Sequence, residues 1–131
     1  MRRDVTTFLL RGVLLFLLLE VLTFPFRETI TRLFEGLIPS PYLAVWECTG
    51  LDEAFLLVSF LLALPGDPKK KATASVLGTL LLEAFNLFRI YIVVNTGSKL
   101  LHDVLFRIGG FLVVLLLFYF LGPRYVTFSR R

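Results

Sequence analysis

The chain has 131 residues, of which 56% are hydrophobic and 15% aromatic, and its mean hydropathy is +0.80. A soluble core of this size cannot bury so much apolar surface, so the composition predicts an all-α membrane protein with one membrane-embedded domain, residues 1–131. In a membrane protein Lys and Arg mainly reflect the orientation of the chain in the bilayer, so we do not take the net charge of +4 as a sign of nucleic-acid binding and exclude that function. One cysteine and one histidine exclude an internal disulfide and a Cys/His zinc cluster, so we expect no metal and no cofactor.

The first apolar run covers residues 8–24 and follows two basic residues, Arg2 and Arg3. This order resembles a signal peptide, but no small-x-small cleavage site follows, and Pro25 ends the run. We therefore expect a retained first membrane helix. Glu20 lies within it, and because a carboxylate is costly in hydrocarbon we expect Glu20 to face other helices or the interface.

A short amphipathic segment, residues 27–38, follows the first helix. Its apolar side chains recur at helical spacing among Arg27, Glu28, Arg32 and Glu35, over a length too short to cross a bilayer. The pattern predicts a helix that lies on the membrane surface. Amphipathicity alone does not distinguish a helix that covers the bundle from one that guides a substrate, so both interpretations stay open.

The second span contains the only cysteine, and its start has two alternatives. Pro41 suits the first helical position, which would give a helix over residues 41–64. The sequence from Thr49 to Asp52 resembles a capping box and would place Cys48 just outside a shorter helix. The choice affects the chemistry, because a helix N-terminus favours the thiolate form of a cysteine.

Two further spans complete the predicted bundle. The third covers about residues 72–94 and contains Asn86 and Arg89, and the fourth covers about residues 104–121. Each meets the roughly 20-residue requirement of a hydrocarbon core about 30 Å thick. We thus expect a bundle of about four transmembrane helices plus one short interfacial helix.

Basic residues gather on one side of the predicted bundle. They are Arg2, Arg3, Lys69, Lys70, Lys71, Arg124, Arg130 and Arg131. The positive-inside rule then places both termini in the cytoplasm, in a multi-pass protein of the cell membrane. With this topology Cys48 and Arg89 approach the outer face from antiparallel spans, and His102 does so from the short outer loop before the fourth span. This convergence is the main functional evidence in the sequence.

Each of these three residues has a catalytic and a structural interpretation. Cys48 beside a cation would favour the nucleophilic thiolate, but a single cysteine in an apolar run is also a common packing residue. Arg89 could stabilise an oxyanion, or it could form an ion pair with Glu83 or Asp52. His102 could exchange protons with the thiol or with a leaving amine, or it could simply be solvated.

Helix geometry adds supporting residues around this group. Asp52 follows Cys48 by four positions and Asn86 precedes Arg89 by three, so each is expected to share a helix face with its neighbour and to line the site. Arg107 follows Asp103 by four positions, so the two can form an ion pair, which we expect to be structural.

Two short motifs resemble elements of the exosortase/archaeosortase family. The sequence ECTGL at residues 47–51 resembles its Cys-Ser/Thr-Gly element, and NLFRI at residues 86–90 resembles its Asn-x-x-Arg element. His102 lies before the last span, as the histidine of many members does. The resemblance covers roughly residues 42–121 and would make the chain a minimal-length member, since members commonly have more membrane helices.

The resemblance implies an intramembrane cysteine transpeptidase or peptidase that cleaves the C-terminal sorting tails of membrane-anchored, secreted proteins at the outer face. Cys48 would be the acyl-forming nucleophile, Arg89 the oxyanion or substrate clamp, and His102 the proton-transfer partner. Some archaeal members have arginine in the third position, which keeps Arg107 as an alternative. A lipid, an amine or water would accept the acyl group. The competing hypothesis is a non-catalytic membrane scaffold or assembly protein, and a transporter is a third, without evident broken midplane helices.

Overall fold

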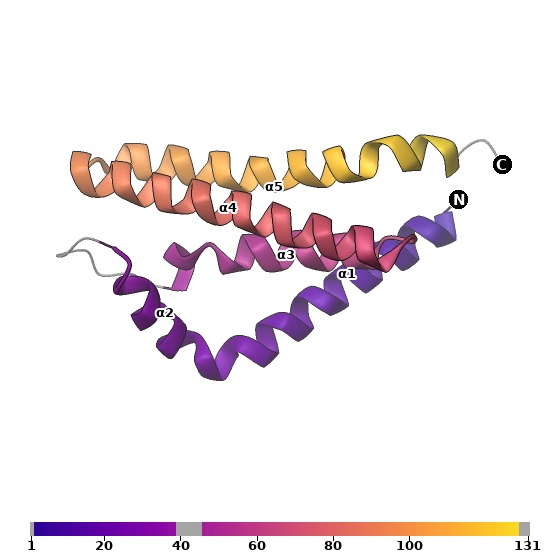
Figure 1. Cartoon of the computed structure of the whole chain (residues 1–131), viewed down its shortest axis with the longest axis horizontal. Helices are drawn as coiled ribbons and strands as arrows, with labels where there is room; N and C mark the ends of the chain where they lie inside the picture. The colour runs from indigo at the N-terminus through magenta and orange to yellow at the C-terminus, as the bar shows by residue number, and fades with distance from the viewer. Residues whose placement is uncertain (1, 39–45, 129–131) are drawn as a thin grey trace.

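The computed structural model describes residues 2–38 and 46–128, and this part of the chain is helical without strands. Its elements are α1 (Arg2–Thr23), η1 (Phe24–Phe26), α2 (Arg27–Glu35), η2 (Trp46–Thr49), α3 (Leu51–Ala63), α4 (Pro68–Thr96) and α5 (Lys99–Phe128). Helices α3, α4 and α5 lie side by side, and α1 packs along α3 (Figure 1). The start of α1 and the end of α5 lie at the same end of the bundle. The expected all-α fold is confirmed.

In the part of the chain that the structure describes, three helical segments are long and apolar enough to cross a membrane: Val5–Glu35, Pro68–Thr96 and Lys99–Leu117. They contain most of the first, third and fourth spans expected from the sequence. The 13 residues of α3 make a helix about 20 Å long, which is shorter than a hydrocarbon core of about 30 Å. The protein is therefore a helical membrane protein in which α3 is unusually short.

The first helix ends at Thr23, just before Pro25, as the sequence predicted, and the chain bends there into a separate short helix, α2. Pro25 lies in η1, and the helical path continues through α2. The bend follows from the missing proline N–H and from the clash of its ring with the preceding turn. Arg27 at the start of α2 forms an ion pair with Glu20 of α1 across the bend. As a result α2 turns back toward the bundle (Figure 1).

The start of α3 decides between the two alternatives for the second span. Gly50 adopts a left-handed conformation (φ +74°) directly before Leu51, so no continuous helix covers residues 41–64. The predicted start at Pro41 itself lies outside the described residues. Cys48 therefore lies in η2, just outside a shorter helix, as the second alternative proposed. The capping box does not form as predicted, because the Thr49 hydroxyl accepts a hydrogen bond from the Leu51 N–H, and Asp52 bonds elsewhere.

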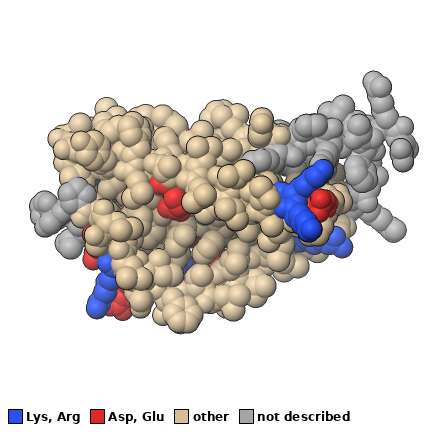
Figure 2. Space-filling view, viewed as in Figure 1, with Lys and Arg blue, Asp and Glu red and all other residues tan. Residues whose placement is uncertain are grey.

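Helix α3 forms the centre of the bundle. Leu57 and Leu61 of α3 pack with Leu82 of α4 and Val113 of α5 in a buried apolar cluster. Small residues allow close helix contact, and a Cβ on Gly12 of α1 would lie only 2.7 Å from the Phe60 ring of α3. The face shown in Figure 2 is largely uncharged, as expected for contact with lipid, and its Lys and Arg side chains lie near its two ends.

Candidate functional site

The η2 turn is attached to the middle of α4 by one buried hydrogen bond. The Asn86 side-chain N–H donates to the Cys48 carbonyl oxygen at 2.7 Å. Within the turn, the Thr49 hydroxyl donates to the Trp46 carbonyl oxygen, also at 2.7 Å. These bonds satisfy backbone carbonyls that the turn would otherwise leave buried without partners. They fix the position of the cysteine relative to α4.

Gly50 lets Asn86 reach this turn. A Cβ at Gly50 would lie 2.9 Å from the Asn86 side-chain nitrogen, the same atom that binds the Cys48 carbonyl. The left-handed backbone of Gly50 also disfavours any residue with a Cβ. The Cys-Thr-Gly sequence thus has a local physical reason: threonine closes the turn, and glycine supplies both its conformation and the space for Asn86.

Replacing Gly50 by alanine is expected to lower the free energy of unfolding by about 2–5 kcal/mol. Left-handed strain contributes about 1–2 kcal/mol, and displacement of Asn86 leaves a buried carbonyl unpaired at a cost of about 1–3 kcal/mol. The loss can be measured by titrating the purified protein with sodium dodecyl sulfate in mixed micelles. Gly97→Ala is the matched control, because Gly97 is left-handed (φ +64°) with nothing within 4 Å of its would-be Cβ. Equal losses in the two variants would contradict the proposed role of Asn86.

Cys48 is covered on its apolar side. Its side chain is 6% exposed and packs in a buried cluster with Ile38 and with Ile90 of α4. Phe34 of α2 and Val94 of α4 pack against this cluster. The apolar face of the amphipathic segment therefore packs over the cysteine. For α2 the sequence left open a helix that covers the bundle and a helix that guides a substrate, and this contact favours the first.

Arg89 lies one turn after Asn86 on the same buried face of α4, as the spacing predicted. It is 4% exposed, and its guanidinium carbon lies 5.2 Å from the centre of the Phe106 ring of α5. Its Nε atom is buried without a hydrogen-bond partner, and no described carboxylate lies within ion-pair distance of it. The structural ion pairs considered for Arg89, with Glu83 or Asp52, do not form.

A buried guanidinium with no carboxylate at ion-pair distance among the described residues is an unusual arrangement. Removing such a charge from water costs free energy that a carboxylate partner normally offsets. The Phe106 ring face offsets part of this cost through a cation–π contact. The remaining hydrogen-bonding capacity of Arg89 makes this side chain suited to an anionic or polar ligand group.

His102 lies in the first turn of α5 and not in a loop, since α5 begins at Lys99. Its ring stacks on Phe106 with a centroid distance of 6.4 Å, and its Nδ1 lies 3.2 Å from a carboxylate oxygen of Asp103. Phe106 thus lies between His102 and Arg89, and it contacts both. The recorded contacts of His102 are with its own helix and do not include Cys48.

Arg107 and Asp52 do not make the contacts expected from helix spacing. Arg107 is exposed on α5, and the ion pair predicted with Asp103 is absent. Asp52 does not share a face with Cys48, because Gly50 interrupts the helix between them. Its carboxylate instead accepts a hydrogen bond from the Trp46 indole N–H at 2.7 Å.

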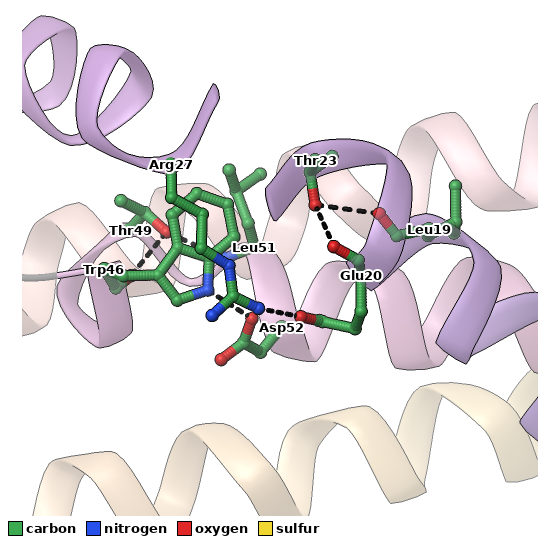
Figure 3. Close-up of polar contacts among 8 residues, drawn as sticks. All are labelled: Leu19, Glu20, Thr23, Arg27, Trp46, Thr49, Leu51 and Asp52. Atoms are coloured by element: carbon green, nitrogen blue, oxygen red, sulfur yellow. Dashed lines mark hydrogen bonds and ion pairs between the residues drawn. The ribbon is translucent and has the colours of Figure 1, made fainter. Parts of the chain in front are cut away.

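The polar cluster around Asp52 was missed by sequence reasoning (Figure 3). Arg27 lies 4.8 Å from the centre of the Trp46 ring, and it pairs with Glu20 on its other side. The cluster therefore connects α1, α2, η2 and the first turn of α3. One signal was available: Glu20 and Arg27 are seven residues apart, which places them on the same side of a continuous helical path.

The structure thus brings the Cys48 turn, Asn86 and Arg89 together on one part of α4, with His102 one ring away from Arg89. In the described residues no group of three or more His, Cys, Asp or Glu side chains is arranged to hold a metal ion. No family profile, curated protein or solved structure matches the chain.

Proposed function

We propose that the protein is an intramembrane cysteine transpeptidase or peptidase of the exosortase/archaeosortase type. Its substrates would be membrane-anchored, secreted proteins that carry a C-terminal sorting tail. Cleavage would occur at the outer face of the cell membrane, and a lipid, an amine or water would accept the acyl group. This proposal rests on the motif resemblance together with the geometry of Cys48 and Arg89.

One observation carries the proposal: Asn86 holds the cysteine turn against the same face of α4 that presents a buried arginine, which has no carboxylate at ion-pair distance in the part of the chain that the structure describes. A packing cysteine and a structural arginine do not require this arrangement. A nucleophile held by the helix face that also carries a buried cation is, by contrast, an arrangement that suits acyl transfer.

The proposed reaction begins with attack of the Cys48 thiolate on the scissile carbonyl carbon. The carbonyl π electrons move to oxygen, and the Arg89 guanidinium stabilises the resulting oxyanion. When the C–O π bond reforms, the C–N bond breaks, and the amine leaves with a proton from the general acid. The acyl group stays on sulfur as a thioester. The acceptor then attacks this thioester and gives its proton to the general acid, now acting as a base, and the C–S bond breaks to regenerate the thiolate.

His102 is the better-supported proton-transfer residue of the two candidates. It stacks on the Phe106 ring that also contacts Arg89, whereas Arg107 is exposed and always protonated near neutral pH. The Asp103 carboxylate beside Nδ1 can orient the imidazole ring. In this assignment a rearrangement at substrate binding brings His102 to the reacting groups.

The proposed topology has four passes and cytoplasmic termini. The start of α1 and the end of α5 share one end of the bundle, and the Lys69–Lys71 segment opens α4 in the turn after α3. Counting α3 with η2 as the second pass then puts Cys48 toward the outer face. Phe34 and Ile38 cover the cysteine, so substrate entry requires α2 to move.

Intact-mass spectrometry of the protein co-purified with a tail-bearing protein from the same organism tests this proposal. We expect an acyl adduct on Cys48 that hydroxylamine releases, because hydroxylamine cleaves thioesters and leaves amides intact. The Cys48→Ala variant is the control and should carry no adduct. Processing of the tail-bearing protein without any adduct, or an adduct that persists in Cys48→Ala, would leave the scaffold hypothesis in place of the peptidase.

A further inference from the structure

A groove lies at the other end of the bundle from Cys48, between α1 and the turn that joins α3 to α4. Its volume is about 540 Å³. It is lined by Arg11, Leu14, Leu15, Leu18, Leu62, Ala63, Leu64, Pro65 and Lys71. Lys71 and Asn86 are 15 residues apart on α4, or about 22 Å along its axis, so this groove is separate from the candidate functional site.

The α1 wall of the groove is one continuous stripe. Arg11, Leu14, Leu15 and Leu18 follow the i, i+3, i+4, i+7 spacing of a single helix face. Arg11 begins the stripe, and Leu18 lies about 10 Å further along the helix toward the middle of the bundle. The groove is therefore cationic at its outer edge and apolar along its length. A phospholipid has the same order of chemistry, with a charged phosphate followed by acyl chains.

Both cations of the groove have hydrogen-bonding capacity to spare. Lys71 donates to the carbonyl oxygens of Leu62 and Leu64, at 3.2 and 2.6 Å, and its ammonium group has a third donor. Carbonyls satisfy donors without neutralising the charge. Arg11 is exposed and has no ion-pair partner in the described part of the chain. Two uncompensated positive charges therefore border one apolar groove.

We propose that this groove binds an anionic glycerophospholipid of the adjacent leaflet. The headgroup phosphate contacts Arg11 and Lys71, and one acyl chain lies along Leu14, Leu15 and Leu18. A zwitterionic headgroup matches this edge poorly, because its choline group would lie near two cations. A free phosphate would leave the apolar wall unused. The lipid would connect the start of α1 to the end of α3.

Native mass spectrometry of the full-length protein in detergent tests the site, with dioleoylphosphatidylglycerol, dioleoylphosphatidylcholine and inorganic phosphate as the three probes. We expect preferential retention of phosphatidylglycerol. Arg11→Gln should weaken its binding roughly fivefold, the factor that corresponds to about 1 kcal/mol for one basic residue near an anionic lipid surface. Lys70→Gln is the matched control: it removes an exposed cation of the same turn that does not line the groove, and binding should stay unchanged.

Leu14→Trp supplies a second variant that changes no charge. The larger side chain fills the apolar wall and should reduce lipid retention, while phosphate retention stays as it was. Equal retention of the two lipids would overturn the proposal, as would equal weakening by Arg11→Gln and Lys70→Gln. Retention of inorganic phosphate as strong as that of phosphatidylglycerol would also overturn it, in favour of a simple anion site. None of these outcomes depends on peptidase activity.

Discussion

Cys48→Ala is expected to abolish removal of the sorting tail, with a fall in the processing rate of at least roughly 1,000-fold, as loss of a covalent nucleophile does in other enzymes. The substitution removes only one sulfur atom from a cluster formed with Ile38 and Ile90. Because the cluster is apolar and the replaced group is small, we expect the free energy of unfolding to fall by only about 1 kcal/mol. Activity and stability should therefore separate clearly. Immunoblotting of the tail-bearing protein measures processing, and mixed-micelle unfolding measures stability.

Ile90→Val is the matched control for this prediction. It removes one methylene from the same buried cluster and leaves the thiol in place. We expect a similar small loss of stability and nearly normal processing. If Cys48→Ala processes tails as Ile90→Val does, the cysteine is a packing residue and the acyl-transfer mechanism is wrong.

Arg89→Met is expected to reduce processing by about 100- to 1,000-fold, the usual effect of removing one oxyanion donor. Removing a paired buried charge normally lowers the free energy of unfolding, whereas we do not expect Arg89→Met to lower it. Breaking a buried ion pair costs about 3–5 kcal/mol, but Arg89 has no carboxylate partner among the described residues. Methionine relieves the desolvation cost of the unpaired guanidinium and still fills the space beside Phe106. We therefore expect unchanged or increased stability together with lost activity.

Arg89→Lys separates charge from geometry. Lysine keeps the positive charge and loses the planar set of donors that can hold an oxyanion from two directions. An intermediate loss of processing is expected, recorded as a fall in the maximal rate at saturating substrate. A strongly destabilised Arg89→Met protein would show instead that the arginine has a structural partner, and the oxyanion role would lose its support.

The local sequence was sufficient to predict features that depend on one segment and its solvent, such as which residues share a buried helix face. The periodicity of α4 placed Asn86 and Arg89 on one face, and that face is buried. The helix is longer than the predicted span of about residues 72–94, since it runs from Pro68 to Thr96 between the N-cap Asp67 and the left-handed C-cap Gly97. The proline signal also marked the end of the first helix: α1 ends at Thr23, and the predicted short amphipathic helix follows as α2 after the turn that contains Pro25.

The sequence by itself determined that this is a helical membrane protein, because hydrophobicity and the 3.6-residue repeat are properties of each segment in its solvent. Only the tertiary structure decided where α3 begins and which partner Asp52 takes, and only it showed that Arg89 has no carboxylate at ion-pair distance among the residues it describes. These outcomes depend on which helices meet and at what depth. A side chain takes its partner from the surface that packs against it, and residues distant in the chain form that surface.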